Sequence, residues 1–136
     1  MSAISREKTA MNKLRSLLLA AIAAFGFTTP ALAHHSDAMF DHDHVTELSG
    51  TIKEFQFTNP HTWLQVSVTD ANGKVVEWSL EWGSPNQLGR QGVRPSTFPP
   101  GTGIKVRINA MRDGTPGGAF IGAKLADGKT LGRWDE

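Results

Sequence analysis

The chain has 136 residues, with 14 Lys and Arg, 13 Asp and Glu, and no cysteine. The missing cysteine excludes disulfides, thiol nucleophiles, iron–sulfur clusters, thiolate metal sites and a lipoprotein anchor. Beyond residue 15 the Lys and Arg residues form no cluster, which argues against nucleic acid as a partner.

Residues 1–33 have the three parts of a secretory signal peptide. Basic residues come first, an apolar run covers 17–27, and Ala31-Leu32-Ala33 places small residues where signal peptidase reads them. The apolar run is too short for a permanent membrane anchor. We therefore expect an exported protein without a transmembrane anchor, in the periplasm or, in a host with one membrane, secreted. Both Met1 and Met11 would serve as its start.

Cleavage after Ala33 would make His34 the first residue of the mature chain. Residues 34–44 read HHSDAMFDHDH, which is too polar for an element of the core. We expect an extended, His-rich N-terminal arm whose Met39-Phe40 pair docks on a single domain formed by residues 45–136.

Alternating apolar residues predict a β-rich domain. The expected strands are 47–57, 62–69, 75–82, 104–110 and 119–125, with a brief pairing at 130–131. Gly50 and the change of parity between Ile52 and Phe55 predict a bend or bulge in the first strand. Asn72-Gly73 predicts the hairpin turn between the second and third strands.

One short helix is expected between the third and fourth strands. Ser84-Pro85 is typical of an N-cap and first helical residue, Gly92 ends the helix, and 95–103 is a Pro-rich loop. The order β-β-β-α-β-β is that of a small five-stranded oligonucleotide/oligosaccharide-binding (OB) barrel, which leaves few exposed sheet edges. The alternative is an open β-sandwich.

Several short motifs stand out along the mature chain. They are His34-His35-Ser36, Ala38-Met39-Phe40-Asp41, Gly50-Thr51-Ile52-Lys53-Glu54-Phe55, Asn59-Pro60-His61-Thr62-Trp63, Val76-Glu77-Trp78-Ser79, Ser84-Pro85-Asn86 and Asp113-Gly114-Thr115-Pro116-Gly117-Gly118. Through them the chain resembles an uncharacterised family of small exported bacterial proteins, classed as a domain of unknown function. The resemblance implies export and a small β-rich fold, and it brings no activity, substrate or site residue.

The histidines point to metal chemistry. An N-terminal His34 can chelate Cu(II) through its amine and Nδ1, and a further imidazole completes the arrangement called a histidine brace. His61 is the only histidine expected inside the domain, so we predict His34 and His61 as copper ligands, with His35 as substitute or helper. His42 and His44, beside aspartates, would capture metal more loosely.

Two alternatives to this copper site stay open. Residues 34–44 can be a solvated tail that binds metal adventitiously, while His61 caps its own turn. Cleavage after Leu32 instead of Ala33 would place His35 third in the mature chain, which is an amino-terminal Cu/Ni-binding motif.

A binding cleft is the second candidate site. OB barrels bind ligands across strands two and three, between the first and last inter-strand loops. The residues expected on this ligand face are Asn59, Trp63, Arg112 and Asp113. Trp78 and Trp82 share one face of the third strand, and we interpret them as core residues and not as a stacking platform.

Enzyme signatures are missing from the sequence. It has no Gly-x-Ser-x-Gly elbow, phosphate loop, His-Glu-x-x-His or dinucleotide fingerprint, and Glu77 and Glu81 are typical of a solvated strand face. We therefore expect a non-enzymatic periplasmic binding protein, for copper binding or delivery. The alternative is an accessory module that recognises a cell-envelope saccharide or protein, and copper-dependent oxidative chemistry is the interpretation we favour least.

Overall fold

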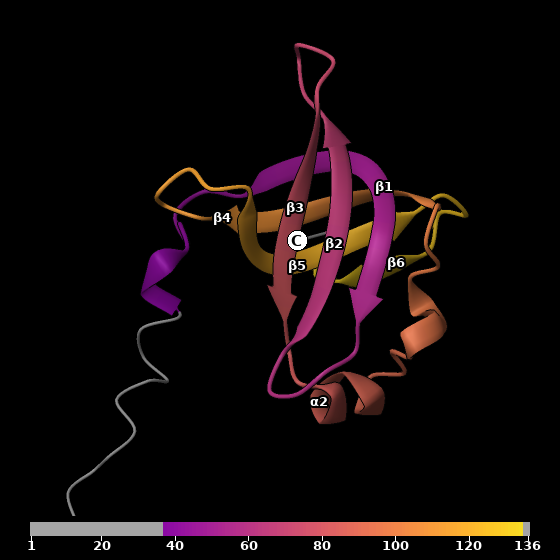
Figure 1. Ribbon diagram of the computed structural model, residues 1–136. Helices are drawn as coiled ribbons and strands as arrows, with labels where there is room; N and C mark the ends of the chain where they lie inside the picture. Colours follow the sequence, from indigo (N-terminus) through magenta and orange to yellow (C-terminus); the bar gives the residue numbers. More distant parts are fainter. Residues whose placement is uncertain (1–36, 135–136) are drawn as a thin grey trace, which may run out of the picture. The chain divides into compact units, whose positions relative to one another are not determined.

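The computed structural model describes residues 37–134, whose strands form one sheet that closes on itself (Figure 1). The strands are β1 (Thr46–Gln56), β2 (Thr62–Thr69), β3 (Val75–Trp82), β4 (Gly103–Ala110), β5 (Gly117–Leu125) and β6 (Thr130–Gly132). Their order in the sheet is β3-β2-β1-β4-β5-β6, and a further pairing joins β3 to β5.

The β3–β5 pairing closes the barrel. It is parallel, with Leu80 opposite Gly118 and Glu81 opposite Ala119. Gly118 is needed there, because a Cβ at this position would lie 2.6 Å from the carbonyl oxygen of Asn109. Together with the helix between β3 and β4, this strand order is that of an OB barrel. The predicted fold is confirmed, and the open sandwich is excluded.

Strand β1 contains the predicted bulge. Its register against β2 shifts between Ile52 and Glu54, which leaves Lys53 as the extra residue. In a regular strand, residues as far apart as Ile52 and Phe55 would point to opposite faces of the sheet. The register shift allows both side chains to face the core. The bulge bends β1 so that it pairs with β2 along one half and with β4 along the other.

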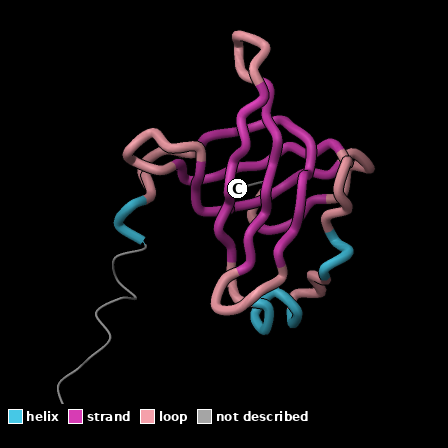
Figure 2. Tube along the Cα trace, viewed as in Figure 1, coloured by secondary structure: helices cyan, strands magenta, loops and turns pink. Residues whose placement is uncertain are grey.

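Helix α2 (Pro85–Arg90) starts as predicted. The Ser84 hydroxyl accepts a hydrogen bond from the backbone N–H of Gln87, and Gly92 ends the turn with a φ of +85°. Figure 1 shows α2 beneath one end of the barrel, and in Figure 2 the hairpin turn between β2 and β3 projects at the opposite end.

The core fills the barrel interior. Its buried side chains come from every strand of the closed barrel: Ile52, Leu64, Val66, Leu80, Ile104, Val106, Ile108, Phe120 and Ala123. Trp78 and Trp82 pack against this cluster, as predicted. Phe98 is also fully buried, with its ring against those of Phe55, Trp82 and Phe120. The segment expected to be only a Pro-rich loop therefore contributes a core residue, after a short 3-10 turn, η2 (Pro95–Thr97).

The N-terminal arm contacts the barrel from Met39, whose carbonyl oxygen accepts a hydrogen bond from the backbone N–H of Arg112 at 2.9 Å. Its described part starts with an exposed 3-10 turn, η1 (Asp37–Met39), and not with the extended conformation expected for it. Phe40 is buried and forms a β-bridge with Met111, whereas Met39 stays exposed. Asp41 donates its backbone N–H to the carbonyl of Ala110 at 2.8 Å. Phe40 thus anchors the arm beside the β4–β5 turn.

Several strand ends differ from the prediction by a residue or two. Strand β1 runs from Thr46 to Gln56 and not from 47 to 57, and β5 begins at Gly117 because two glycines pair with β3. None of the helices within residues 37–134 has the length and hydropathy needed to cross a bilayer.

Candidate metal-binding site

His61 occupies a firmly held position at the start of β2. The next residue, Thr62, is fully buried and donates both its backbone N–H and its hydroxyl to the carbonyl oxygen of Gly83, each at 3.1 Å. On the other side, the Thr58 hydroxyl donates to the carbonyl oxygen of His61 at 3.3 Å. These bonds fix the backbone from which the imidazole projects.

Glu81 orients the His61 ring. Its carboxylate contacts Nδ1 of His61, and its side chain is only 14% exposed against 43% for His61. Glu81 sits near the end of β3, opposite Trp63 on β2 and Ala119 on β5. In the tautomer whose Nδ1–H donates to Glu81, Nε2 carries the lone pair that a metal ion would take. A histidine held by a carboxylate in this way is the usual arrangement behind a metal-bound imidazole.

His61 and Glu81 both line a cavity of about 290 Å³. Asp37 from η1, His61 and Glu81 line it, and Trp82 and Phe120 form its apolar wall. The start of the described arm and the turn that carries His61 therefore share one cavity. The predicted ligands His34 and His35 lie outside the described residues.

His42 and His44 are engaged with aspartates of the arm. Nε2 of His42 lies 3.0 Å from the carbonyl oxygen and 3.1 Å from Oδ1 of Asp37. Nδ1 of His44 lies 2.9 Å from Oδ2 of Asp41. Within residues 37–134 no group of at least three histidine or acidic side chains is placed to hold a metal ion. These contacts of His42 and His44 with aspartates of the same arm stabilise its conformation.

The hydrogen bond from His44 is the main reason that the pKa of Asp41 is lowered. Partial burial of the carboxyl raises this pKa, while the backbone N–H of Asp43 and the positive charges of His44 and Arg112 lower it further. Arg112 lies 3.9 Å from Asp41 and 4.0 Å from Asp43.

The four residues predicted for the ligand face do not form one cluster of contacts. Trp63 is half-buried on β2, between Gln56 of β1 and Glu81 of β3, and Asn59 is exposed in the β1–β2 loop. Arg112 faces the N-terminal arm.

Asp113 is committed to its own turn. Its Oδ1 accepts hydrogen bonds from the backbone N–H of Thr115 at 3.0 Å and from the Thr115 hydroxyl at 2.7 Å. These two bonds, the backbone bond first, lower the pKa of Asp113. The carboxylate thus stabilises the β4–β5 turn.

Glu81 is the residue of this site that the sequence analysis missed, because it was interpreted as part of a solvated strand face. The pairing of residues across the β2–β3 hairpin would have placed Glu81 near His61. Counting outward from the Asn72-Gly73 turn puts Thr62 opposite Trp82 and Trp63 opposite Glu81. The same count brings Glu81 next to the turn that carries His61.

The model of a family of unknown function, DUF6152, matches residues 22–120 of the chain. Comparison with curated proteins found no match. Among solved structures, the chain is similar to a mitochondrial single-stranded DNA-binding protein of S. cerevisiae, with 12% identity and a TM-score of 0.46 over 61% of this chain and 93% of that one.

Proposed function

The chain belongs to the family of unknown function DUF6152, and we propose that it is an exported protein that binds copper(II) through His34 and His61. The amine and ring of His34 would supply two nitrogen donors, and Nε2 of His61 a further one. His35 would be a substitute or helper. The protein acts by binding or delivering the metal and not by catalysis.

The observation that carries this proposal is the pairing of His61 with Glu81. A carboxylate that accepts the Nδ1 proton fixes the tautomer and makes Nε2 a better donor to a metal. Glu81 also adds negative charge beside the cavity, which favours a divalent cation. Imidazole and amine nitrogens in a tetragonal arrangement suit Cu(II) better than Mg²⁺ or Ca²⁺, which prefer oxygen ligands.

The position of the arm supports the same site. Asp37 and His61 line one cavity, and His34 precedes Asp37 by three positions. Three residues span at most about 10 Å when extended. A chain that begins at His34 therefore has the length to bring its amine to the mouth of the cavity that His61 occupies.

Copper titration of the mature protein tests the proposal, after mass spectrometry has confirmed that the exported chain starts at His34. His61→Ala should weaken Cu(II) binding by about 100-fold or more, because it removes a ligand and not only a supporting contact. An alanine added before His34 should weaken it similarly, because it removes the amine from the chelate. His44→Ala is the matched control and should leave the affinity within about threefold, since that ring is paired with Asp41. Equal affinities for His61→Ala and the parent protein would refute the site.

A second candidate function, recognition of an envelope saccharide, is favoured by the outer surface of β2 and β3. Trp63 is half-buried there. Gln65, two positions further along the same face of β2, donates a hydrogen bond to the hydroxyl of Ser79 on β3 at 3.0 Å. An indole beside amide and hydroxyl groups is a usual surface for stacking and hydrogen bonding to a sugar ring. Tryptophan fluorescence titration with envelope glycans, with Trp63→Ala as comparison, would detect it.

A further inference from the structure

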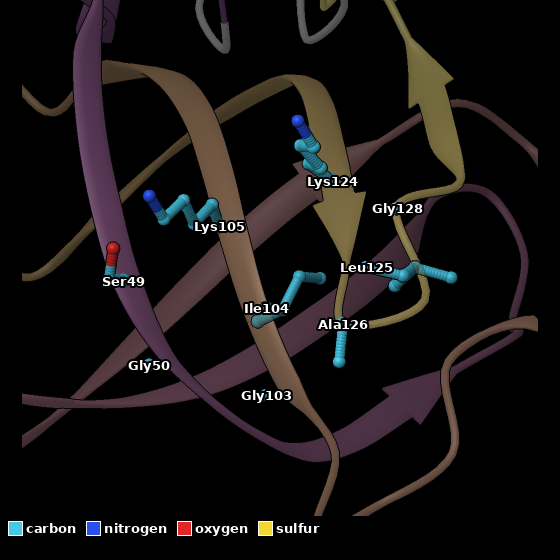
Figure 3. Close-up of a pocket in the computed structure, with 9 residues that line it drawn as sticks. All are labelled: Ser49, Gly50, Gly103, Ile104, Lys105, Lys124, Leu125, Ala126 and Gly128. Carbon is cyan, nitrogen blue, oxygen red and sulfur yellow. The ribbon is translucent and has the colours of Figure 1, made fainter.

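A second hollow lies on the barrel at the other end of β5 from the His61 cavity. It has a volume of about 410 Å³ and is formed by β1, the start of β4, the end of β5 and the turn that follows (Figure 3). Lys105, Lys124 and Ser49 line it, together with the apolar side chains of Ile104, Leu125 and Ala126. Its volume falls within the range of small-molecule sites.

The strand register places the two lysines in one row. Lys105 of β4 lies directly opposite Lys124 of β5, and on its other side directly opposite Ser49 of β1. Both lysines are exposed. Like charges directly opposite each other on antiparallel strands destabilise the sheet. A bound anion would reduce this repulsion between the two ammonium groups.

Among residues 37–134, neither of the two lysines forms an ion pair with an acidic side chain. Lys53 pairs with Glu77 and Arg112 with Asp41, but neither Lys105 nor Lys124 has a carboxylate within 4.0 Å in this part of the chain. The residues that line the groove include no aspartate or glutamate. The side chains that line the groove therefore include two ammonium groups and no carboxylate.

Two of the glycines that line the groove border open space. Gly103 and Gly128 both line the groove, and a Cβ built on either of them would meet no atom within 4 Å. In Figure 3 Lys105 extends toward β1, where Ser49 lies, Lys124 lies at the top of the view on β5, and Leu125 and Ala126 lie below Lys124. The lining thus separates into a cationic part and an apolar part.

We propose that this groove binds a small organic anion, a carboxylate or phosphate attached to a compact apolar body. Lys105 and Lys124 hold the anionic group, and the Ser49 hydroxyl donates a hydrogen bond to it. The apolar body lies against Leu125 and Ala126. The site is independent of the copper proposal, because the two share no residue.

Amide chemical-shift titrations of the full mature protein test this proposal. The probes are phenyl phosphate and benzoate, which carry the two anionic groups on the same ring, and benzyl alcohol is the uncharged control. We expect saturable shifts at Gly103, Gly128 and Ala126 with at least one anion and not with the alcohol, and weaker binding at higher salt. The anion that binds more tightly identifies the group preferred.

Variants establish which side chains bind the anion. Lys105→Gln and Lys124→Gln should each weaken binding roughly two- to fivefold, the range of an exposed charge pair. Lys74→Gln, in the exposed β2–β3 turn, is the matched control and should have no effect. The lysine variants should unfold at the same or a higher temperature than the parent protein without ligand, because a repulsion is removed. Shifts that are absent, that also occur with benzyl alcohol, or that persist unchanged in both lysine variants would overturn the proposal.

Discussion

The contact between His61 and Glu81 joins an inter-strand turn to the end of another strand. His61 has the more exposed side chain, and Glu81 is mostly covered. The carboxylate is therefore placed to hold the imidazole and not to face solvent, although it alternates along β3 with core residues Leu80 and Trp82.

Removing the charge of Glu81 should weaken copper binding without unfolding the barrel. In Glu81→Gln we expect the affinity for Cu(II) to fall about 10- to 100-fold, because the amide holds the His61 ring less firmly and adds no negative charge. Glu77→Gln is the control, since Glu77 lies on the same face of β3 but pairs with Lys53. Competition titration with a copper chelator measures both, and an equal loss in the two variants would contradict the role given to Glu81.

The attachment of the N-terminal arm should depend on pH through Asp41. Because the pKa of this carboxyl is lowered from its usual 3.8 in the folded protein, its ionised form stabilises the docked arm. That contribution is complete above 3.8 and is lost as the pH falls through the lower, folded value. Hydrogen exchange at the backbone amides of Asp41 and Arg112 should accelerate in that acidic range and much less in Asp41→Asn, whose side chain does not titrate. Exchange rates without this extra acceleration in the parent protein would contradict the assignment.

Single residues were predictable from the sequence where the pattern is local. Ser84 was identified as an N-cap and Phe40 as a docking residue from their immediate neighbours, and the structure agrees. Glu81 and Arg112 were not assigned their partners, because those partners lie on other strands and in the arm. A one-dimensional pattern contains no direct measure of such contacts.

At the scale of elements, β1 depends on a glycine at its crossing with β2. A Cβ at Gly50 would lie 2.4 Å from the carbonyl oxygen of Ser67 and 2.9 Å from a methyl group of Val66. The backbones of the two strands could approach this closely only with a residue that lacks a side chain.

Gly50→Ala should therefore lower the free energy of unfolding by about 1–3 kcal/mol, the usual cost of a clash in a packed region. Gly103→Ala is the control, because its Cβ would meet no atom within 4 Å. Urea denaturation measures both. A Gly50→Ala protein as stable as the parent would show that β1 and β2 can separate without cost.

Elements with a strong period were the easiest to predict. Strands β2 and β3 alternate along their length and are joined by an Asn-Gly turn, so their ends were expected where the structure has them. The segment of Phe98 was harder, because its three prolines are typical of a surface loop. Its burial follows from the open end of the barrel, which Phe98 fills against Phe55 and Phe120.

At the scale of the whole molecule, closure of the barrel brings the two proposed sites onto opposite ends of β5. The His61 cavity includes Ala119 and Phe120, and the lysine groove includes Lys124 and Leu125. The order of strands and helix along the sequence predicted this barrel. The parallel pairing of β3 with β5 follows from that fold and not from a local pattern, because Gly117 and Gly118 do not alternate with polar residues.

The electron paramagnetic resonance spectrum of Cu(II) bound to the mature protein tests the central claim most directly. The account predicts an axial spectrum with nitrogen couplings from the amine and ring of His34 and the ring of His61, and the loss of one nitrogen coupling in His61→Ala. A spectrum of His61→Ala identical to that of the parent protein would contradict it.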